Sequence, residues 1–448
     1  MDRKVFVEKL FLAAKNAGID EFEAYFETSD DFSVDVMDGE IREYSASNTA
    51  GVCFRGLYAG RMGYASSEEM DEEAIEMLVE GVKGNALLIE TDDKEIIYGG
   101  DSDYAVIERD IEKISDMHAD EKIQLALDME KAMREADERV VRSEGCGYMS
   151  GIHEKQIVNS KGLDVSFKTG TVGAVVAPIV SENGKVNFAF DMKFAFDKKD
   201  VDVKELAERA VDEAIKSMNA SSIPSGSYKA IFRNDVAATM LGVFSSVFSG
   251  ENAKKGLTLL KGREGEMIAS ECVTITDDPL LETGFASTPF DAEGVKTYTK
   301  DVVKDGKLMT LLHSLKTCPE KSTGNASKAG YSAPVQVAPT NFYLAPGDIS
   351  LDEMIESVEN GIMITSLMGM HSGANQISGD FSLGAKGFLI ENGKIVRPVD
   401  QITVAGNFFE VLKKVTSIAA DLRFARPSSV TSIGAPSFMV QEIAVAGL

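Results

Sequence analysis

The stretch Ser378-Gly-Asp-Phe-Ser-Leu-Gly-Ala-Lys-Gly-Phe-Leu-Ile-Glu-Asn-Gly-Lys394 is the part of this sequence that says most about the fold. Gly379, Gly384 and Gly387 remove side chains where another backbone can approach closely, or where the chain can take a positive φ. Asn392-Gly393 follows directly on one apolar run and precedes another, which is a strong signal for a tight hairpin. This composition is typical of a barrel or sheet corner.

The rest of the chain alternates hairpin signals with amphipathic helices. Hairpin turns are predicted at Asp38-Gly39, Asn183-Gly184 and Asp305-Gly306. Capping boxes predict helices that start after Ser66-Ser-Glu-Glu69 and Ser350-Leu-Asp-Glu353. Apolar spacing predicts further helices over 2–17, 120–136, 203–218 and 408–420.

No βαβ rhythm is visible, so the predicted class is α+β, with antiparallel sheets, packed helices and two to three domains. The predicted boundaries are an N-terminal α+β domain at 1–110, a central helix and antiparallel-strand domain at 111–222, and a mostly β domain at 223–448. The linker between the last two is Ser221-Ser-Ile-Pro-Ser-Gly-Ser227.

The composition of the chain indicates where the protein is located and which partners it can bind. The chain has 46 Lys and Arg against 72 Asp and Glu, a net charge of −26, and no local basic patch, which argues against nucleic-acid binding. No apolar run approaches the length of a membrane span, and the N-terminus lacks the apolar core of a signal peptide. Four scattered cysteines without CxxC spacing favour a reducing compartment, so a cytoplasmic location is expected.

The histidines do not form a metal-binding motif by spacing. His153-Glu154 begins like a zinc-protease helix, but position 157 is isoleucine and the segment lies among predicted strands. None of the four histidines has another three to five residues away. His313 with Cys318, and His371 with Asp380, are alternative constellations for an autonomous hydrolase.

The chain resembles the TldD/PmbA family, described as modulators of DNA gyrase and as cytoplasmic metalloproteases, over nearly its whole length. The matching segments are Gly51–Arg55, Gly60–Gly63, Gly265–Ser270 with Asp277-Asp278, Thr323–Asn325, Leu344–Gly347, Ser378–Gly387, Ile390–Lys394 and Ile402–Asn407.

The resemblance implies two kinds of subunit. The TldD kind binds a metal through HExxxH on a helix and a cysteine near the C-terminus. The PmbA kind, also called TldE, lacks these residues. Here Leu241, Gly242 and Ser246 occupy the HExxxH positions on a predicted helix over 235–248, and no cysteine lies near 428–432. None of the three can act as a zinc-protease ligand or base, so no metal or other cofactor is predicted.

The resemblance therefore implies a PmbA/TldE-like subunit of a TldD/TldE-type metalloprotease, which acts on unfolded polypeptides or peptide precursors and is itself non-catalytic. Its expected assembly is a homodimer, or a heterodimer with a TldD-like subunit. The candidate peptide groove comprises His371, Asn375, Asp380 and Gly384, because strand addition beside glycine gaps suits recognition of a peptide backbone. The alternatives are the autonomous hydrolase and a non-enzymatic interaction protein.

Overall fold

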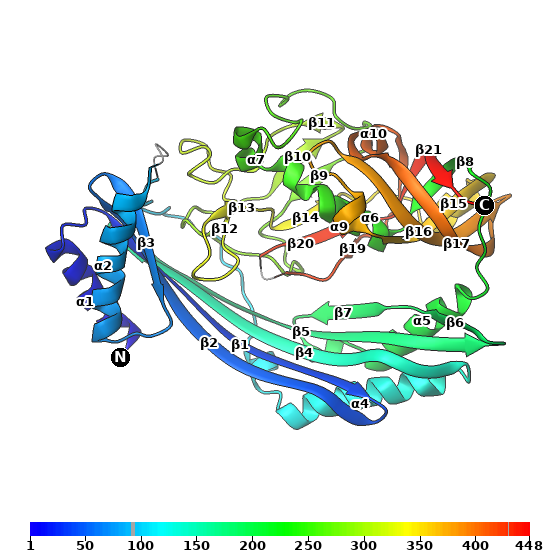
Figure 1. Cartoon of the computed structure of the whole chain (residues 1–448), viewed down its shortest axis with the longest axis horizontal. Helices are drawn as coiled ribbons and strands as arrows, with labels where there is room; N and C mark the ends of the chain where they lie inside the picture. The colour runs from blue at the N-terminus through cyan, green and yellow to red at the C-terminus, as the bar shows by residue number, and fades with distance from the viewer. Residues whose placement is uncertain (91–94, 429) are drawn as a thin grey trace. The chain divides into compact units, whose positions relative to one another are not determined.

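The computed structural model describes residues 1–90, 95–428 and 430–448, which form two compact units (Figure 1). Unit 1 comprises Met1–Ile215, Thr288–Thr297 and Cys318–Gln336, and unit 2 comprises Lys216–Ser287, Tyr298–Thr317 and Val337–Leu448. The predicted α+β class with mostly antiparallel sheets is confirmed. The division at residues 110 and 222 stays a prediction. None of the described helices is long and apolar enough to cross a bilayer.

Unit 1 is built on one antiparallel sheet in the order β3-β2-β1-β4-β5-β6, with β7 also paired to β5 (Figure 1). Alternate residues of β1 are buried on one face of the sheet, as the period of a strand requires. Its first half packs under α1 and α2, and its second half packs against α4. The strands are β1 (Phe22–Met37), β2 (Glu40–Tyr58), β3 (Arg61–Ser67), β4 (Val140–Asn159), β5 (Asp164–Glu182), β6 (Lys185–Phe188) and β7 (Asp191–Ala195), and the helices are α1 (Arg3–Asn16), α2 (Glu72–Leu88), α3 (Glu112–Ser115), α4 (Ala119–Ala136), η1 (Lys198–Asp200) and α5 (Val203–Lys216).

The other face of this sheet carries a second cluster, in which Tyr25, Cys53 and Ile157 pack with Phe290 and Ala326. The last two residues come from the distant segments that complete unit 1, which include β12 (Ala326–Ser327) and the start of β13 (Gln336–Val337).

Unit 2 contains a sheet that closes on itself. Its order is β17-β16-β15-β8-β21-β18, and β17 also pairs with β21. A second sheet has the order β11-β10-β9-β14-β20-β19. The pairs β8–β15 and β14–β20 are parallel. The strands are β8 (Gly226–Phe232), β9 (Ile275–Asp277), β10 (Lys300–Lys304), β11 (Lys307–Leu308), β14 (Asn341–Leu344), β15 (Asn360–Met368), β16 (Asp380–Glu391), β17 (Lys394–Asn407), β18 (Val415–Ile418), β19 (Arg423–Phe424), β20 (Ser432–Ala435) and β21 (Phe438–Ala446). The helices are α6 (Asn234–Phe244), η2 (Ser245–Phe248), α7 (Gly250–Lys255), α8 (Leu351–Glu356), α9 (Met370–Gly373) and α10 (Phe408–Lys413).

The four predicted hairpin turns are confirmed by backbone geometry. Both turn residues of each have positive φ, for example 51° at Asn392 and 71° at Gly393. Positive φ at both central residues defines the type I′ turn, whose twist matches that of the flanking strands. The helices predicted over 2–17, 120–136 and 203–218 correspond to α1, α4 and α5.

Of the two predicted capping boxes, one is wrong and one is right. Ser66 and Ser67 end β3, and α2 begins later, where the side chain of Asp71 accepts the N–H of Ala74. The capping box of Ser350 and Glu353 is present with both of its hydrogen bonds.

The helix predicted over 408–420 stops at Lys413, and β18 follows at once. Val415, Thr416 and Ile418 are β-branched, and β18 pairs with β21, so strand pairing overrides the helical spacing.

Candidate functional site

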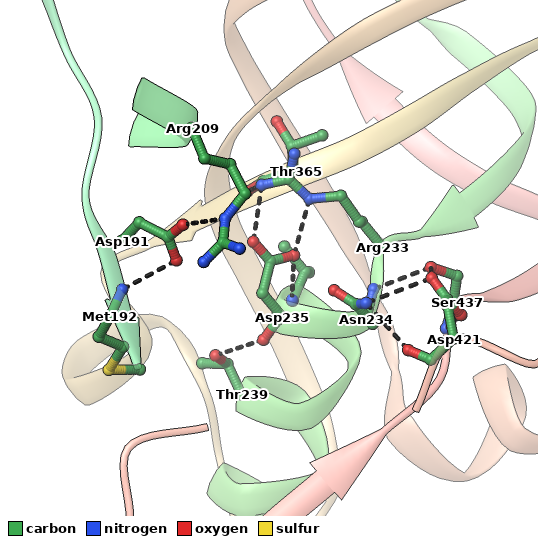
Figure 2. A network of polar contacts seen from close by, with 11 residues as sticks. Asp191, Met192, Arg209, Arg233, Asn234, Asp235, Thr239, Thr365, Asp421 and Ser437 are labelled. Carbon is green, nitrogen blue, oxygen red and sulfur yellow. Dashed lines mark hydrogen bonds and ion pairs between the residues drawn. The ribbon is translucent and has the colours of Figure 1, made fainter. Parts of the chain in front are cut away.

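Helix α6 follows directly on strand β8, and its first turn is held by hydrogen bonds to neighbouring segments of unit 2 (Figure 2). Arg233 donates to both carboxylate oxygens of Asp235, at 3.0 and 2.6 Å. The N–H of Asn234 donates to Ser437 Oγ at 3.0 Å, and Ser437 Oγ donates to Asp421 at 2.7 Å. The start of the helix is therefore fixed to the segment that joins β20 to β21.

The first two positions that the resemblance assigns to a metal lie on this helix. Leu241 is 5% exposed and belongs to the main apolar core of unit 2. A Cβ on Gly242 would lie 3.6 Å from Cγ1 of Ile433, so this face of α6 packs closely on β20. Phe244, which ends the helix, stacks on Phe408 with 4.7 Å between ring centroids. We interpret α6 as a packing helix.

The third position, Ser246, lies beyond the end of α6, in the 3-10 turn η2. Its carbonyl accepts the side-chain amide of Asn252 at 2.9 Å, and its Oγ lies 3.5 Å from Oε1 of Gln376. The loop that carries the candidate groove residues therefore lies against the end of the helix where a catalytic relative would bind its metal.

The segment assigned to the metal cysteine is also close to α6, since Ile433 adjoins Ser432. Ser428 and Thr431 form a local turn, and the hydroxyl of Ser432 is buried with no hydrogen-bond partner among the described residues. The fold thus brings α6 close to the segment assigned to the metal cysteine, but the side chains at these positions that could bind a metal are only serine and threonine hydroxyls. No group of three or more His, Cys, Asp or Glu among the described residues is placed to hold a metal ion. These residues do not fit a zinc site, which takes nitrogen, thiolate or carboxylate ligands.

The candidate groove residues lie on one segment, and His371, Asn375 and Asp380 are exposed on its surface. The Oδ1 of Asn375 accepts the N–H groups of Ile377 and Ser378, at 3.0 and 3.1 Å. The carboxylate of Asp380 accepts Nδ2 of Asn407 at 2.9 Å and Oγ of Ser378 at 2.8 Å. These hydrogen bonds hold the pKa of the Asp380 carboxyl below its usual value. Asn375 and Asp380 therefore also shape the loop.

Gly384 lies within the closed sheet, opposite Met368 of β15 and Thr403 of β17. A Cβ there would be 3.5 Å from Cε of Met368, an ordinary van der Waals contact. Gly387 is different, because a Cβ there would lie 1.9 Å from the carbonyl oxygen of Met363. The close backbone approach expected of this stretch thus occurs at Gly387.

Asn407 is a residue of this region that was not predicted as part of the site. It bonds Asp380, accepts the N–H groups of Phe409 and Glu410 as the N-cap of α10, and lines a pocket of about 270 Å³. The charged lining residues are Glu410, Lys414 and Glu442, and the last two form a 2.9 Å ion pair. The pocket joins β8, β17, α10 and β21, which are far apart in the sequence, so no local motif indicates it.

The contacts of His313 and Asp380 with other residues give little support to the two histidine pairs considered for an autonomous hydrolase. His313 is half-buried, which lowers the pKa of its imidazole, and its Nδ1 lies 3.2 Å from the Thr317 hydroxyl. The Asp380 carboxylate is occupied by Asn407 and Ser378, as described above. His153 lies on strand β4, 3.5 Å from Oδ1 of Asp31, which agrees with the rejection of a zinc-protease helix at this histidine.

Comparison with known proteins finds three family models that match successive parts of this chain. Models of the PmbA/TldA metallopeptidase domain 1, central domain and C-terminal domain match residues 22–86, 112–218 and 225–447. A metalloprotease of Methanothermobacter thermautotrophicus is 30% identical over 88% of this chain and 87% of its own length. The chain belongs to the PmbA/TldD family. The predicted resemblance is therefore confirmed.

Further relatives and solved structures are similar to this chain over most of its length. Metalloprotease PmbA of Escherichia coli O157:H7 is 27% identical and covers 93% of this chain and 90% of its own. A solved Thermotoga maritima protein, described as a modulator of a DNA gyrase, is 31% identical with a TM-score of 0.91, over 99% of this chain and 100% of its own. TldE from Thermococcus kodakarensis shares the fold, with a TM-score of 0.89 at 24% identity over 99% of this chain and 100% of its own.

Proposed function

We propose that this chain is a PmbA/TldE-type, non-catalytic subunit of a cytoplasmic TldD/TldE-type metalloprotease that degrades unfolded polypeptides or peptide precursors. The observation that carries the proposal is the composition of α6 and η2. Leu241, Gly242 and Ser246 occupy the positions that the resemblance assigns to metal ligands and base, and Leu241 and Gly242 pack in the interior of unit 2. Four free cysteines suit a reducing compartment. The partner is a second copy or a TldD-like subunit, and the latter would supply the metal.

The peptide-handling part of the proposal is placed on the surface formed by His371, Asn375, Asp380 and Gly384. Two features support this position. The loop lies against the end of α6 through Ser246 and Gln376, and Asn407 connects Asp380 to a pocket of about 270 Å³. Exposed imidazole, amide and carboxylate groups near a pocket can fix the main chain of a peptide with little regard to its sequence.

The first test is metal content. The purified and dialysed chain is expected to hold far less than one zinc per chain, because its metal positions carry no nitrogen or thiolate ligand. Elemental analysis makes the measurement, and a TldD-type relative with both histidines, purified identically, is the positive control. Retention of about one zinc per chain would contradict the proposal.

The second test concerns the groove and uses Gly384→Val together with a TldD-type subunit. Valine suits a strand, and a Cβ at Gly384 makes only ordinary contacts with Met368, on the face of β16 that carries the exposed Ser382, so the fold is expected to persist. Partner-dependent peptide cleavage is expected to fall about tenfold in kcat/KM, because the added methyls occupy room left for a substrate.

Gly384→Ala, which adds only the tolerated Cβ, is the matched control and is expected to retain most of the cleavage. A Gly384→Val chain that melts at the wild-type temperature and supports full cleavage would remove this surface from the proposal. Loss of stability without loss of activity per folded molecule would show that Gly384 serves the backbone alone.

A further inference from the structure

Strands β17 and β21 separate within the closed sheet of unit 2, and the pocket lined by Asn407 lies where they part. Their pairing stops at Ala405, opposite Ala444. β17 continues beside β16 as far as Asn407, whereas β21 next pairs on this side with β18, at Val440. The sheet therefore contains a gap of about 270 Å³, whose walls belong to two strands that do not pair with each other here.

Small residues line the walls of this gap. Ala405 and Gly406 come from β17, and Ala444 comes from β21. A Cβ on Gly406 would lie 3.0 Å from both Cδ1 of Ile443 and Cζ of Phe381, which is closer than ordinary van der Waals contact. Since these residues have little or no side chain, a ligand in the gap can approach the main chain of both strands closely.

Two apolar residues and three charged ones complete the character of the pocket. Val411 and Ile443 are buried and belong to the main apolar core of unit 2. Glu410, Lys414 and Glu442 are half-exposed. An apolar interior with a few polar groups at its mouth is typical of a site that orients a small ligand.

The charged side chains are held by hydrogen bonds and favour a cation. Glu442 accepts Nζ of Lys414 at 2.9 Å and the hydroxyl of Ser227 at 3.3 Å, and the Lys414 bond holds the pKa of its carboxyl below its usual value. A 2.9 Å bond from Lys413 lowers the pKa of the Glu410 carboxyl in the same way. Both acids are therefore ionised at neutral pH. The lining carries two carboxylates against one ammonium group, in a chain of net charge −26.

We infer that this pocket binds the N-terminal end of a peptide, with the α-ammonium group between Glu410 and Glu442 and the first peptide groups beside the main chain of β17 and β21. The volume lies just below the range of about 300–1,000 Å³ for pockets that enclose a drug-sized molecule, so it suits the end of a peptide only. This inference rests on the proposed function and deepens it by naming the part of the peptide that the subunit holds.

Lys414 takes the place of the ligand in the free chain. Its ammonium group is paired with Glu442, and the incoming α-ammonium group replaces it there. An exposed ion pair of this kind stabilises a fold very little, so the exchange of one ammonium group for another costs little.

Calorimetric titration of the full chain with trialanine amide tests the inference. This probe has a free α-ammonium group and no carboxylate, and its expected Kd is on the order of 0.1–1 mM. Two further probes are expected to bind at least about tenfold more weakly, since each lacks an ammonium group next to the first peptide group. They are N-acetyl-trialanine amide and N-acetyl-lysine amide. Equal affinity of either for the chain would overturn recognition of a peptide N-terminus.

Glu442→Gln locates the site. It keeps the shape of the side chain and removes its charge, and is expected to weaken binding of trialanine amide about tenfold. Glu266→Gln is the matched control, because Glu266 pairs with Arg263 at 2.8 Å and its side chain is 55% exposed, as is that of Glu442. The control is expected to bind like the wild type. Equal binding by both variants would overturn the assignment to this pocket.

Lys414→Gln decides which end of the peptide is held. It removes the ammonium group that competes for Glu442, so affinity for trialanine amide is expected to rise about threefold or more, with an unchanged melting temperature. A carboxylate ligand would instead lose its partner. Weaker binding by Lys414→Gln, or tighter binding of N-acetyl-trialanine with a free carboxylate, would overturn the inference in favour of a peptide C-terminus.

The titrations contain no TldD-type subunit and no metal, so their failure is distinct from failure of the zinc and cleavage tests. A chain that binds no trialanine amide at millimolar concentration, yet supports partner-dependent cleavage, would overturn the N-terminal site and leave the proposed function in place. Retention of zinc would contradict the proposed function whatever the titrations give.

Discussion

Replacement of Asp277 by alanine is expected to lower the free energy of unfolding of unit 2 by about 3–5 kcal/mol, and its Tm by about 10 °C. The side chains of Asp277 and Lys300 are 0% and 5% exposed, and their charged atoms are 2.9 Å apart. The other carboxylate oxygen accepts the N–H and the hydroxyl of Thr340, at 2.6 and 2.9 Å. Alanine leaves a buried ammonium group without this partner, which costs far more than the pair itself contributes.

A double-mutant cycle with Lys300→Met separates the pair from the surrounding packing. The double variant is expected to be more stable than Asp277→Ala alone, because it removes the stranded charge. Lys304→Ala, which breaks an exposed ion pair with Asp301 in the same unit, is the control, with an expected change below about 1 kcal/mol. Urea or thermal unfolding followed for all four variants makes the measurement. Equal effects of the buried and exposed substitutions would show that the buried pair does not stabilise unit 2.

Replacement of Gly387 by alanine is expected to destabilise unit 2 by about 3 kcal/mol. A methyl group there would lie 1.9 Å from the carbonyl oxygen of Met363, and a backbone atom within a paired strand cannot move aside as the end of a side chain can. The position also adjoins irregularities in the pairing of β16 with both β15 and β17. Glycine is used at such places because two backbones meet without room for a Cβ.

Gly384→Ala is the matched control, since the two glycines share one strand and differ in what a Cβ would meet. Its expected change in free energy of unfolding is below about 1 kcal/mol. Denaturant midpoints of the two variants make the comparison. A Gly387→Ala chain as stable as Gly384→Ala would show that β15 moves away at little cost, and would contradict a rigid sheet corner at this point.

The sequence was sufficient wherever the signal is local. Asn392-Gly393 and Asp305-Gly306 specify type I′ turns through residues that take positive φ readily, and the structure has these turns. Ser350 and Glu353 specify the start of α8 because both capping bonds form within one helical turn. Leu241, Gly242 and Ser246 carry no nitrogen, thiolate or carboxylate ligand, so the expectation of a poor metal site rests on the aligned motif alone and stays a prediction.

Local signals failed where a distant segment competes for the same residues. The spacing after Phe408 is helical, but β21 takes Val415–Ile418 into a sheet, so α10 ends early. Ser66 and Ser67 match a capping box, but pairing with β2 keeps them in β3, and Asp71 caps α2 instead.

Sequence by itself determined the α+β class, the tight turns, most helices and the family of this chain, because each depends on residues close together or on an ordered set of motifs. Only the tertiary structure decided that Gly387, and not Gly384, is the crowded glycine, that Asp380 bonds to Asn407, and that Asp277 is buried against Lys300. These features depend on which segments meet across the sheets, and a one-dimensional pattern contains no record of contacts between residues far apart along the chain.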